Sequence, residues 1–351
     1  MKKYLTHSQY IKTGPHFLAS FFVVFSLLLT ACSDSPSAVT LSGKTMGTTY
    51  NITLANPDTT LDLTHLQDVI DQELLKINQL MSTYIPNSEL SRFNHQVDIG
   101  QWFPLSAETF TVLEYSLGLS KQTQGKFDVT VAPLINLWGF GYQKKTSFPS
   151  DNDITQALKT IGHQYIELDT QQRAVKKHRA VTVDLSAVAK GYGVDRITEV
   201  LDNKKIEHYL VEIGGEIRVK GLNKESNLWR IGIETPSLHQ SGAQKIVALK
   251  NQSVATSGDY RNFFEKDGIR YSHTLDPATG KPVVHNIASL TVIHNSAMEA
   301  DALATAFMAM GKEQALAMAN VYNIPVYILL YENNSFSASY SQAFESYLSS
   351  N

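Results

Sequence analysis

Hydrophobic residues recur along this chain at two different periods, and the period separates the predicted helices from the predicted strands. Steps of three and four residues predict helices over about 64–81, 106–125, 154–162, 297–310 and 313–322. Thr64 and Gln67 have the spacing of a capping box at the start of the first helix, and Ser106 is placed to cap the second. Gly125 and Gly162 are suited to end the second and third helices.

Strand signals fall between and after these helices. Tyr50, Ile52 and Leu54 alternate with polar residues and predict an early strand. Further strands are predicted at 181–185, 209–213, 216–219, 229–233, 246–249 and 287–293, with a final strand at 325–331. Gly214-Gly215 is a hairpin signal between two of them. Helices and β-hairpins mix without a regular strand–helix alternation, which predicts an α+β fold in one large domain or two interlocked ones.

The N-terminal segment has a different pattern from the rest of the chain. A basic start with Lys2 and Lys3 precedes an apolar run over 17–29, which is short for a membrane-spanning helix and typical of a signal peptide. The sequence Leu29-Thr30-Ala31-Cys32 resembles the lipobox of bacterial lipoproteins. We therefore expect a signal peptide over 1–31, a lipidated Cys32 with a polar linker over 32–40, and a folded domain over 41–351. A free thiol at Cys32 is the alternative.

Composition excludes several classes of site. Cys32 is the only cysteine, so an internal disulfide framework and cysteine-based catalysis are excluded from the folded part. The formal net charge is −3 and no basic run follows the signal peptide, which argues against nucleic acid as a partner. Standard nucleotide and metalloprotease motifs, such as GxxxxGK[ST], GxGxxG after a strand and HExxH, are missing.

Four segments concentrate polar residues that an apolar core would not require. The first covers 125–141, where glycines would let backbone approach a ligand, and where Phe127, Trp138 and Phe140 could pack on a planar ring. An aromatic core with turn glycines is the alternative. The second covers 184–192, where a strand runs into a helix whose first turn, with Lys190, suits phosphate oxygens. Asp184 in that segment could instead be the helix cap.

The other two segments offer a base and a metal pair. His273 precedes the turn sequence Asp276-Pro277-Ala278-Thr279-Gly280, which would hold it at a sheet rim as a base, or as an ordinary hydrogen-bonding residue. Asp301 and Thr305 are four residues apart on a helix otherwise rich in apolar residues, so their oxygens point the same way. A carboxylate and a hydroxyl so placed suit Mg²⁺, whereas hydrogen bonds within the helix are the alternative.

Together with Thr45-Met46-Gly47-Thr48, Met81-Ser82-Thr83-Tyr84 and Ser91-Arg92-Phe93-Asn94, these segments resemble the ApbE family of FAD:protein FMN transferases. The resemblance covers nearly the whole chain after the signal peptide, and it implies an ApbE-like, T-fold-related architecture. It also implies a Mg²⁺-dependent reaction that cleaves FAD at its pyrophosphate, joins FMN through its phosphate to a Thr or Ser hydroxyl of a target protein, and releases AMP.

The resemblance also assigns residues. The FAD site would be lined by Met46, Tyr84, Lys126, Phe127, Asp128, Asp184, Lys190 and Leu275. The metal would be held by Asp301, Thr305 and the backbone carbonyl of Ala187. His273 would take the proton from the attacking hydroxyl, and Asp301 would also be catalytic through the metal. Some relatives have acidic residues where this chain has Lys190 and Ala304, so the metal here has one fewer possible carboxylate.

Partners and location follow from the same resemblance. The expected acceptors are flavin-bearing subunits of membrane respiratory complexes of the sodium-translocating NADH:quinone oxidoreductase type. The expected location is the periplasmic side of a bacterial membrane, lipid-anchored, with the inner membrane favoured over the outer. Two other functions stay open: an FAD pyrophosphatase that releases FMN and AMP, and a flavin-binding lipoprotein without chemistry.

Overall fold

The computed structural model describes residues 37–141, 148–234, 243–258, 263–266, 269–332 and 335–348. The predicted signal peptide and Cys32 lie outside the described residues, as does the linker up to residue 36. One compact unit extends from Ala38 onward. Its first strand already begins at Ala38, so residues 38–40 of the predicted linker belong to the sheet.

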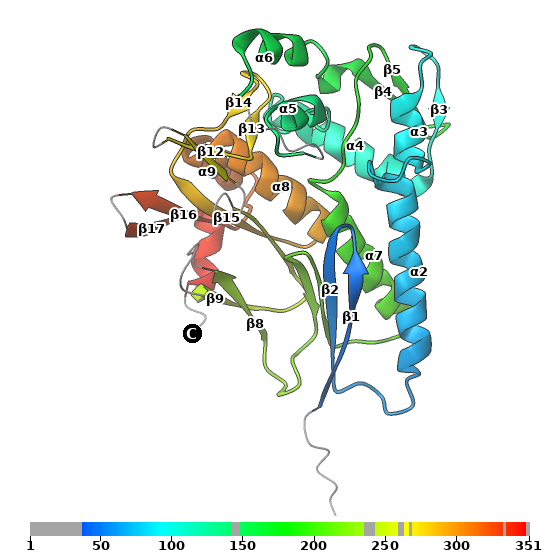
Figure 1. The fold of residues 1–351 in the computed structure, drawn as a ribbon. Helices are drawn as coiled ribbons and strands as arrows, with labels where there is room; N and C mark the ends of the chain where they lie inside the picture. Colours follow the sequence, from blue (N-terminus) through cyan, green and yellow to red (C-terminus); the bar gives the residue numbers. More distant parts are fainter. Residues whose placement is uncertain are drawn as a thin grey trace, which may run out of the picture. The chain divides into compact units, whose positions relative to one another are not determined.

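A central sheet of eight strands organises this unit (Figure 1), and every neighbouring pair in it is antiparallel. Its spatial order is β1 (Ala38–Thr45), β2 (Thr48–Ala55), β6 (Tyr209–Ile213), β7 (Glu216–Lys220), β10 (Ser253–Gly258), β15 (Ile287–His294), β16 (Val326–Glu332) and β17 (Ser335–Tyr340). Gly214 and Gly215 both have positive φ, at 61° and 104°, and form the tight turn between β6 and β7.

Helices cover one face of the sheet. Helix α7 (Ala189–Asn203) contacts β6 and β7, α8 (Ala297–Met310) contacts β10 and β15, and α2 (Leu63–Met81) packs on α7. Side chains spaced by three and four residues on α2, among them Leu66, Ile70 and Leu74, share a buried cluster with Ile197 of α7 and Val211 of β6. Helices α3 (Glu89–His95), α4 (Ala107–Gln122) and α9 (Lys312–Val321) complete this side.

The opposite face carries the hairpin of β8 (Trp229–Glu234) and β9 (Ala243–Leu249) and the 3₁₀ helix η2 (Gln342–Tyr347). Trp229, Val247, Leu329 and Phe344 belong to one buried cluster there. Along β15 the side chains alternate between faces, because Leu290 and Val292 belong to the helix-side core whereas Ile293 belongs to this cluster.

Smaller elements sit beyond one end of the sheet. They are α5 (Ala132–Leu137), α6 (Asp151–Leu158), η1 (His163–Tyr165), the hairpins β11 (Phe263–Lys266)–β12 (Ile269–Ser272) and β13 (Leu275–Asp276)–β14 (Lys281–Pro282), and the sheet of β3 (Phe103–Pro104), β5 (Ala174–Lys177) and β4 (Ile166–Asp169). The Trp138 indole N–H donates to the Gly280 carbonyl at 2.8 Å, which fixes the 125–141 segment to the β13–β14 hairpin.

Most of the predicted elements are confirmed, and four details are wrong. Residues 181–185 form no strand, for a reason given with the site. Helix α2 is capped by Asp62, which accepts from the His65 N–H, because the helix begins one residue before Thr64. Helix α6 ends at Leu158 rather than at Gly162. The strand predicted to be last, β16, is followed by β17, whose mostly exposed residues lack the apolar pattern of a core strand.

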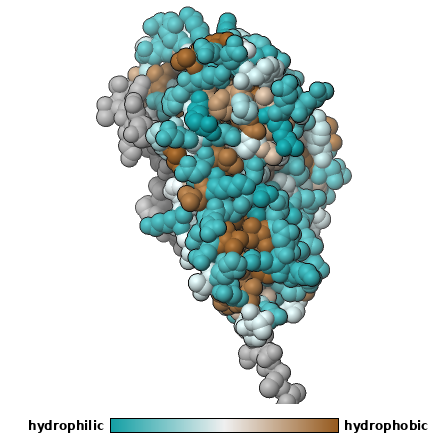
Figure 2. All heavy atoms as spheres, turned by 90° about the vertical axis from the view of Figure 1, so that its right-hand side faces the viewer, coloured by the Kyte–Doolittle hydropathy of each residue, from teal (hydrophilic) through white to brown (hydrophobic). Residues whose placement is uncertain are grey.

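The face of the molecule around α2 is mostly hydrophilic, with apolar residues gathered in a few separate patches (Figure 2). Among the residues that the structure describes, no helix is long and apolar enough to cross a membrane. The predicted attachment through Cys32 lies outside the described residues and stays a prediction.

Candidate active site

Two adjoining cavities lie where the helix layer meets the end of the sheet. The first has a volume of about 570 Å³ and the second about 430 Å³. Asp184, Ser186 and Lys190 line both. The short segment that leads into α7 is thus the common wall of the two cavities.

The first cavity is walled largely by apolar side chains. Met46 and Gly47 form the tight turn between β1 and β2, with φ of 49° and 73°, and this turn places the Met46 side chain against the cavity. Ile77 and Met81 from the end of α2 line it, as does Tyr84, whose side chain is largely exposed. Both predicted site residues on this side, Met46 and Tyr84, are therefore at the same cavity.

A serine pair shapes the loop that carries Tyr84. The hydroxyls of Ser88 and Ser91 both donate to the Ser82 carbonyl, at 2.5 Å and 3.2 Å. Ser88 also caps α3 by accepting from the Ser91 N–H. The loop between α2 and α3 is closed by these bonds, so Tyr84 is presented by a fixed turn.

The second cavity gathers all the remaining described residues of the predicted site. Segments that are far apart in the sequence converge on it, and it has a polar wall. These residues are Lys126, Phe127, Asp128, Asp184, Ala187, Lys190, His273, Leu275, Asp301 and Thr305.

The segment before α7 is extended but is not a strand. Its backbone bonds to a side chain and to a loop. The Asn94 side chain accepts from the Val183 N–H at 2.7 Å and donates to the Val183 carbonyl at 2.8 Å. The Asp184 N–H donates to the Val129 carbonyl at 2.7 Å. These bonds satisfy the backbone without a neighbouring strand, which is why the prediction at 181–185 is wrong.

Asp184 does not cap α7. Its carboxylate accepts from the Ser186 N–H at 2.8 Å within a turn, and the helix starts after Val188, which makes no side-chain capping bond. In the first turn of α7, the Ala189 N–H donates to the Leu185 carbonyl and the Gly191 N–H to the Asp301 carboxylate, so the cavity meets chiefly the positive end of the helix dipole. That arrangement suits an anionic ligand, as predicted for this segment.

Asp301 lies at the centre of the polar wall. It is buried, its Oδ2 accepts from the Gly191 N–H at 3.0 Å, and the same oxygen lies 3.5 Å from the Lys190 ammonium. Lys190 also pairs with the buried Glu216 at 3.0 Å. Asp301 is thus held by the first turn of α7, so the alternative that it bonds only within its own helix does not apply.

The charges of this cluster are strongly coupled. Burial opposes the charged form of Lys190, but the Asp301 and Glu216 carboxylates outweigh it and raise the pKa of the lysine. Burial is also the first cause that raises the pKa of Glu216 and of Asp301. Two carboxylates face one ammonium, and the raised pKa values of the two carboxyl groups mean that burial favours a proton in this cluster.

An ion pair and a set of hydrogen bonds to a carboxylate stabilise the rim opposite α8. Lys126 pairs with Asp276 at 2.9 Å, which joins the 125–141 segment to the hairpin beside His273. The Asp128 carboxylate accepts from the backbone and hydroxyl of Thr130 and from the backbone of His163, at 2.8, 2.6 and 2.9 Å. The oxygens of Asp128 are therefore engaged within the protein.

The three predicted aromatic residues have different surroundings. Phe127 and Trp138 are buried in two separate core clusters, as the aromatic-core alternative predicted. Phe140 lies edge-on to His273, with ring centroids 6.3 Å apart. His273 lies between β12 and β13 and lines the second cavity.

The second cavity offers oxygen donors of the kind that a hard cation prefers. Asp301 and Thr305 are one turn apart on α8, and Ala187 lines the same cavity. Glu216 adds a buried Oε2 that has no hydrogen-bond partner among the described residues. In that part of the chain no group of three or more His, Cys, Asp or Glu side chains is placed to hold a metal. A Mg²⁺ site here would need hydroxyl and backbone donors beside the Asp301 carboxylate, as in the predicted set of Asp301, Thr305 and the Ala187 carbonyl.

Glu216 is a charged residue of this wall that the sequence analysis did not predict. It is the first residue of β7 and follows the Gly214-Gly215 turn. Its position reads as the start of a strand, where a glutamate is usually solvent-exposed. The sequence did offer a signal for Glu216. Its carboxylate directly follows a glycine pair, and the alternation of the strand turns this position toward the helix layer.

Comparison with known proteins decides the family. The model of the ApbE family matches residues 46–328. The chain belongs to the ApbE family. Two curated relatives named FAD:protein FMN transferase cover it almost entirely: that of Vibrio cholerae is 44% identical over 92% of this chain and 96% of its own, and that of Escherichia coli K12 is 35% identical over 92% and 95%.

Solved ApbE structures have the same fold. "Flavin Transferase ApbE from Vibrio cholerae" matches with a TM-score of 0.83 and 41% identity, over 89% of this chain and 100% of that one. The apo form of the Pseudomonas stutzeri flavinyl transferase ApbE matches with a TM-score of 0.82 and 35% identity, over 90% and 98%. The predicted family and the α+β fold class are confirmed by these matches.

Proposed function

We propose that this ApbE protein transfers FMN from FAD to a Thr or Ser hydroxyl of a target protein and releases AMP. The observation that carries the proposal is the convergence of residues from distant motifs on one cavity, in a chain whose relatives bear the name FAD:protein FMN transferase. The acceptor hydroxyl oxygen attacks the phosphorus of the FMN half, the pyrophosphate P–O bond breaks, and the electron pair leaves with AMP.

Each polar residue has a part in this reaction. Phosphoryl transfer depends mainly on positioning and on neutralising charge. Lys190 and the positive dipole end of α7 lie at the cavity and would attract pyrophosphate oxygens. His273, on the opposite rim, would accept the proton of the attacking hydroxyl. Met46 and Tyr84 would contact the flavin nucleotide in the first cavity. Asp184, which lines both cavities, and four residues of the second cavity would complete the FAD site; these four are Lys126, Phe127, Asp128 and Leu275.

The reaction is proposed to require Mg²⁺. Asp301, Thr305 and the Ala187 carbonyl would hold the ion, and when bound it would supply charge neutralisation at the pyrophosphate. Asp301 is already oriented for this by the Gly191 N–H.

The acceptor and the location are part of the same proposal. Flavin-bearing subunits of membrane respiratory complexes, of the sodium-translocating NADH:quinone oxidoreductase type, are the proposed acceptors. A lipid on Cys32 would tether the domain at the periplasmic side of the membrane, in the inner membrane rather than the outer. Tethering raises the local concentration of enzyme and acceptor when both share one membrane.

A labelling experiment tests the proposal. The purified protein is incubated with FAD, Mg²⁺ and an acceptor subunit, and covalent flavin fluorescence on the acceptor is read in a denaturing gel. We expect labelling that EDTA abolishes. An acceptor that the Vibrio cholerae relative labels, but that this protein leaves unlabelled, would contradict transfer. Release of free FMN and AMP without an acceptor would indicate the pyrophosphatase activity instead.

A further inference from the structure

Helices α7 and α8 approach each other closely at Gly191. A Cβ built on this glycine would lie 2.2 Å from the Ala297 carbonyl oxygen and 2.8 Å from the Asp301 Cβ. Both distances are far below van der Waals contact, so only glycine fits at this position. The crossing point lies directly beside the Asp301 carboxylate.

Two hydrogen bonds cross this contact in opposite directions. The Gly191 N–H of α7 donates to the Asp301 carboxylate of α8 at 3.0 Å. In return, the Ala297 N–H of α8 donates to the Asp195 carboxylate of α7 at 2.9 Å. In each helix the two participating residues are four apart and share one face. Each helix therefore binds the backbone of the other, one turn apart on both.

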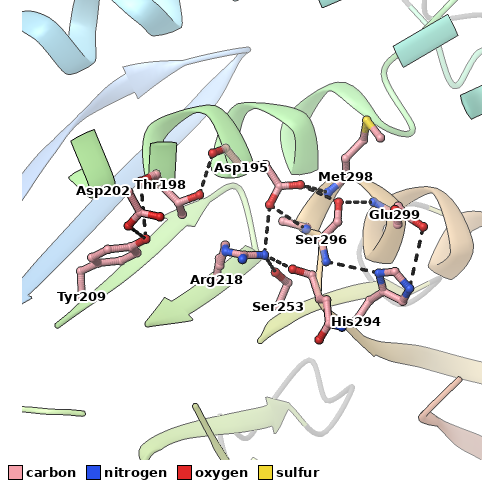
Figure 3. A network of polar contacts seen from close by, with 12 residues as sticks. Asp195, Thr198, Asp202, Tyr209, Arg218, Ser253, His294, Ser296, Met298 and Glu299 are labelled. Carbon is pink, nitrogen blue, oxygen red and sulfur yellow. Dashed lines mark hydrogen bonds and ion pairs between the residues drawn. The ribbon is translucent and has the colours of Figure 1, made fainter. Parts of the chain in front are cut away.

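Asp195 makes further bonds to the start of α8 (Figure 3). It accepts from the Ser296 hydroxyl at 2.6 Å and from the Met298 N–H at 3.0 Å. Arg218 of β7 lies 3.4 Å from the same carboxylate and also binds the Asn295 carbonyl. An acidic side chain on α7 thus neutralises the positive end of α8 and satisfies N–H groups that the helix leaves unpaired.

We propose that Asp195 is a positioning residue for the metal-binding face of α8: it fixes the register of α8 against α7, so that Asp301 and Thr305 meet the segment at Ala187. This inference rests on the metal site of the proposed function. Outer groups that orient metal ligands are worth roughly 10- to 100-fold in metal affinity. Asp195 acts through the helix rather than through the ligand itself, so the lower end of that range applies.

The test measures Mn²⁺ binding to the FAD-free protein by electron paramagnetic resonance, with Mn²⁺ as the probe for Mg²⁺. Asp195→Asn is compared with Asp202→Asn, which lies on the same helix. Asp202 accepts from the Tyr209 hydroxyl at 2.7 Å and pairs with Lys220 at 2.9 Å, away from α8. Both variants are measured well below their melting temperatures, where circular dichroism shows them folded.

We expect Asp195→Asn to weaken Mn²⁺ binding about tenfold. Asp202→Asn should leave Mn²⁺ binding unchanged, even if its melting temperature falls as much as that of Asp195→Asn. Ser296→Ala is the second variant should Asp195→Asn not fold. It removes one bond to Asp195 together with the cap bond from the Glu299 N–H, leaves the other Asp195 bonds to α8 in place, and should weaken binding less. Unchanged binding in Asp195→Asn, or an equal loss in Asp202→Asn, would overturn the proposal. A wild-type protein that binds no Mn²⁺ would instead contradict the metal site of the proposed function, and this inference with it.

Discussion

The two cavities share the wall formed by Asp184, Ser186 and Lys190, and their other lining residues differ. The first, between the β1–β2 turn and the end of α2, is bounded largely by Met46, Ile77 and Met81. The second, between α8 and the β13–β14 hairpin, adds two buried carboxylates, those of Glu216 and Asp301, which pair with the Lys190 that lines both cavities. An apolar wall holds a ligand by surface contact, whereas a charged wall can act on a reacting phosphate.

This difference suggests that the first cavity mainly binds FAD and that the second carries the chemistry. The 184–190 segment is the only described part that lines both cavities at its polar positions, so a ligand spanning them passes over Asp184 and Lys190. Changes in the second cavity should therefore affect the rate of transfer. Changes in the first should affect the affinity for FAD.

The largest effect is expected from Asp301→Ala. This change removes the only carboxylate in the proposed metal set, and metal-assisted charge stabilisation is worth several kcal/mol, or roughly 10³-fold or more in rate. Transfer, measured as covalent flavin fluorescence on the acceptor, should fall below detection. FAD binding, measured by quenching of flavin fluorescence, should persist.

Asp301→Asn is the matched control for shape. It keeps an oxygen that can accept from the Gly191 N–H but loses the charge, so it should fold and still be inactive. Transfer by Asp301→Asn at the wild-type rate would show that the charge of this residue has no part in the reaction. The assignment of the chemistry to the second cavity would then be wrong.

The next largest effect is expected from His273→Ala. A general base contributes about 10²- to 10⁴-fold, so transfer should slow by that factor while FAD affinity stays within about twofold. His178→Ala is the control, since His178 is exposed and pairs with Glu167 far from the cavity lining. An equal loss of transfer rate in both variants, or a change in FAD affinity alone, would contradict the role of His273 as the base.

The sequence predicted much of this arrangement where chemistry and local pattern agree. Asp301 and Thr305 were paired from helical spacing alone, and α8 has the predicted bounds, Ala297–Met310. Both features depend on residues within one turn of each other. The Gly214-Gly215 turn was found for the same reason, because positive φ at two successive residues is a local requirement.

What could not be predicted depends on contacts between distant segments. Val183 lies in a strand-like run, yet its backbone bonds go to Asn94, which is 89 positions earlier. Asp195 has no local signature, because its partners at the start of α8 lie about a hundred residues later. Asp128 was assigned to FAD by resemblance, and only the fold reveals that His163 and Thr130 already engage it.

Asp128 therefore gives a prediction about stability rather than rate. Asp128→Asn should lower the free energy of unfolding at pH 7 by about 1–3 kcal/mol, because buried donors on Thr130 and His163 lose a charged acceptor. Transfer should fall much less than in Asp301→Asn. Urea denaturation monitored by circular dichroism measures the loss, and an unchanged midpoint would show that the carboxylate is not an anchor.

The same variant predicts a pH dependence. Although burial opposes ionisation, hydrogen bonds from His163 and Thr130 lower the pKa of Asp128 below its ordinary value of 3.8. A carboxyl whose pKa is lower in the folded state contributes stability that is complete above pH 3.8 and is lost as the pH falls through the folded pKa. The stability gap between wild type and Asp128→Asn should thus be constant near neutrality and narrow below that pH.

The smallest effect is expected from Tyr84→Ala in the first cavity. An aromatic contact is worth about 0.5–1.5 kcal/mol, which corresponds to roughly two- to tenfold in the Kd for FAD. Because the Tyr84 side chain is 70% exposed, its loss should leave the stability of the fold unchanged. Tyr322→Ala removes a tyrosine of similar exposure, 56%, at the end of α9 and should not change the Kd. If Tyr84→Ala instead lowered the transfer rate at saturating FAD, the first cavity would share in the chemistry, and the separation of binding from catalysis between the two cavities would be wrong.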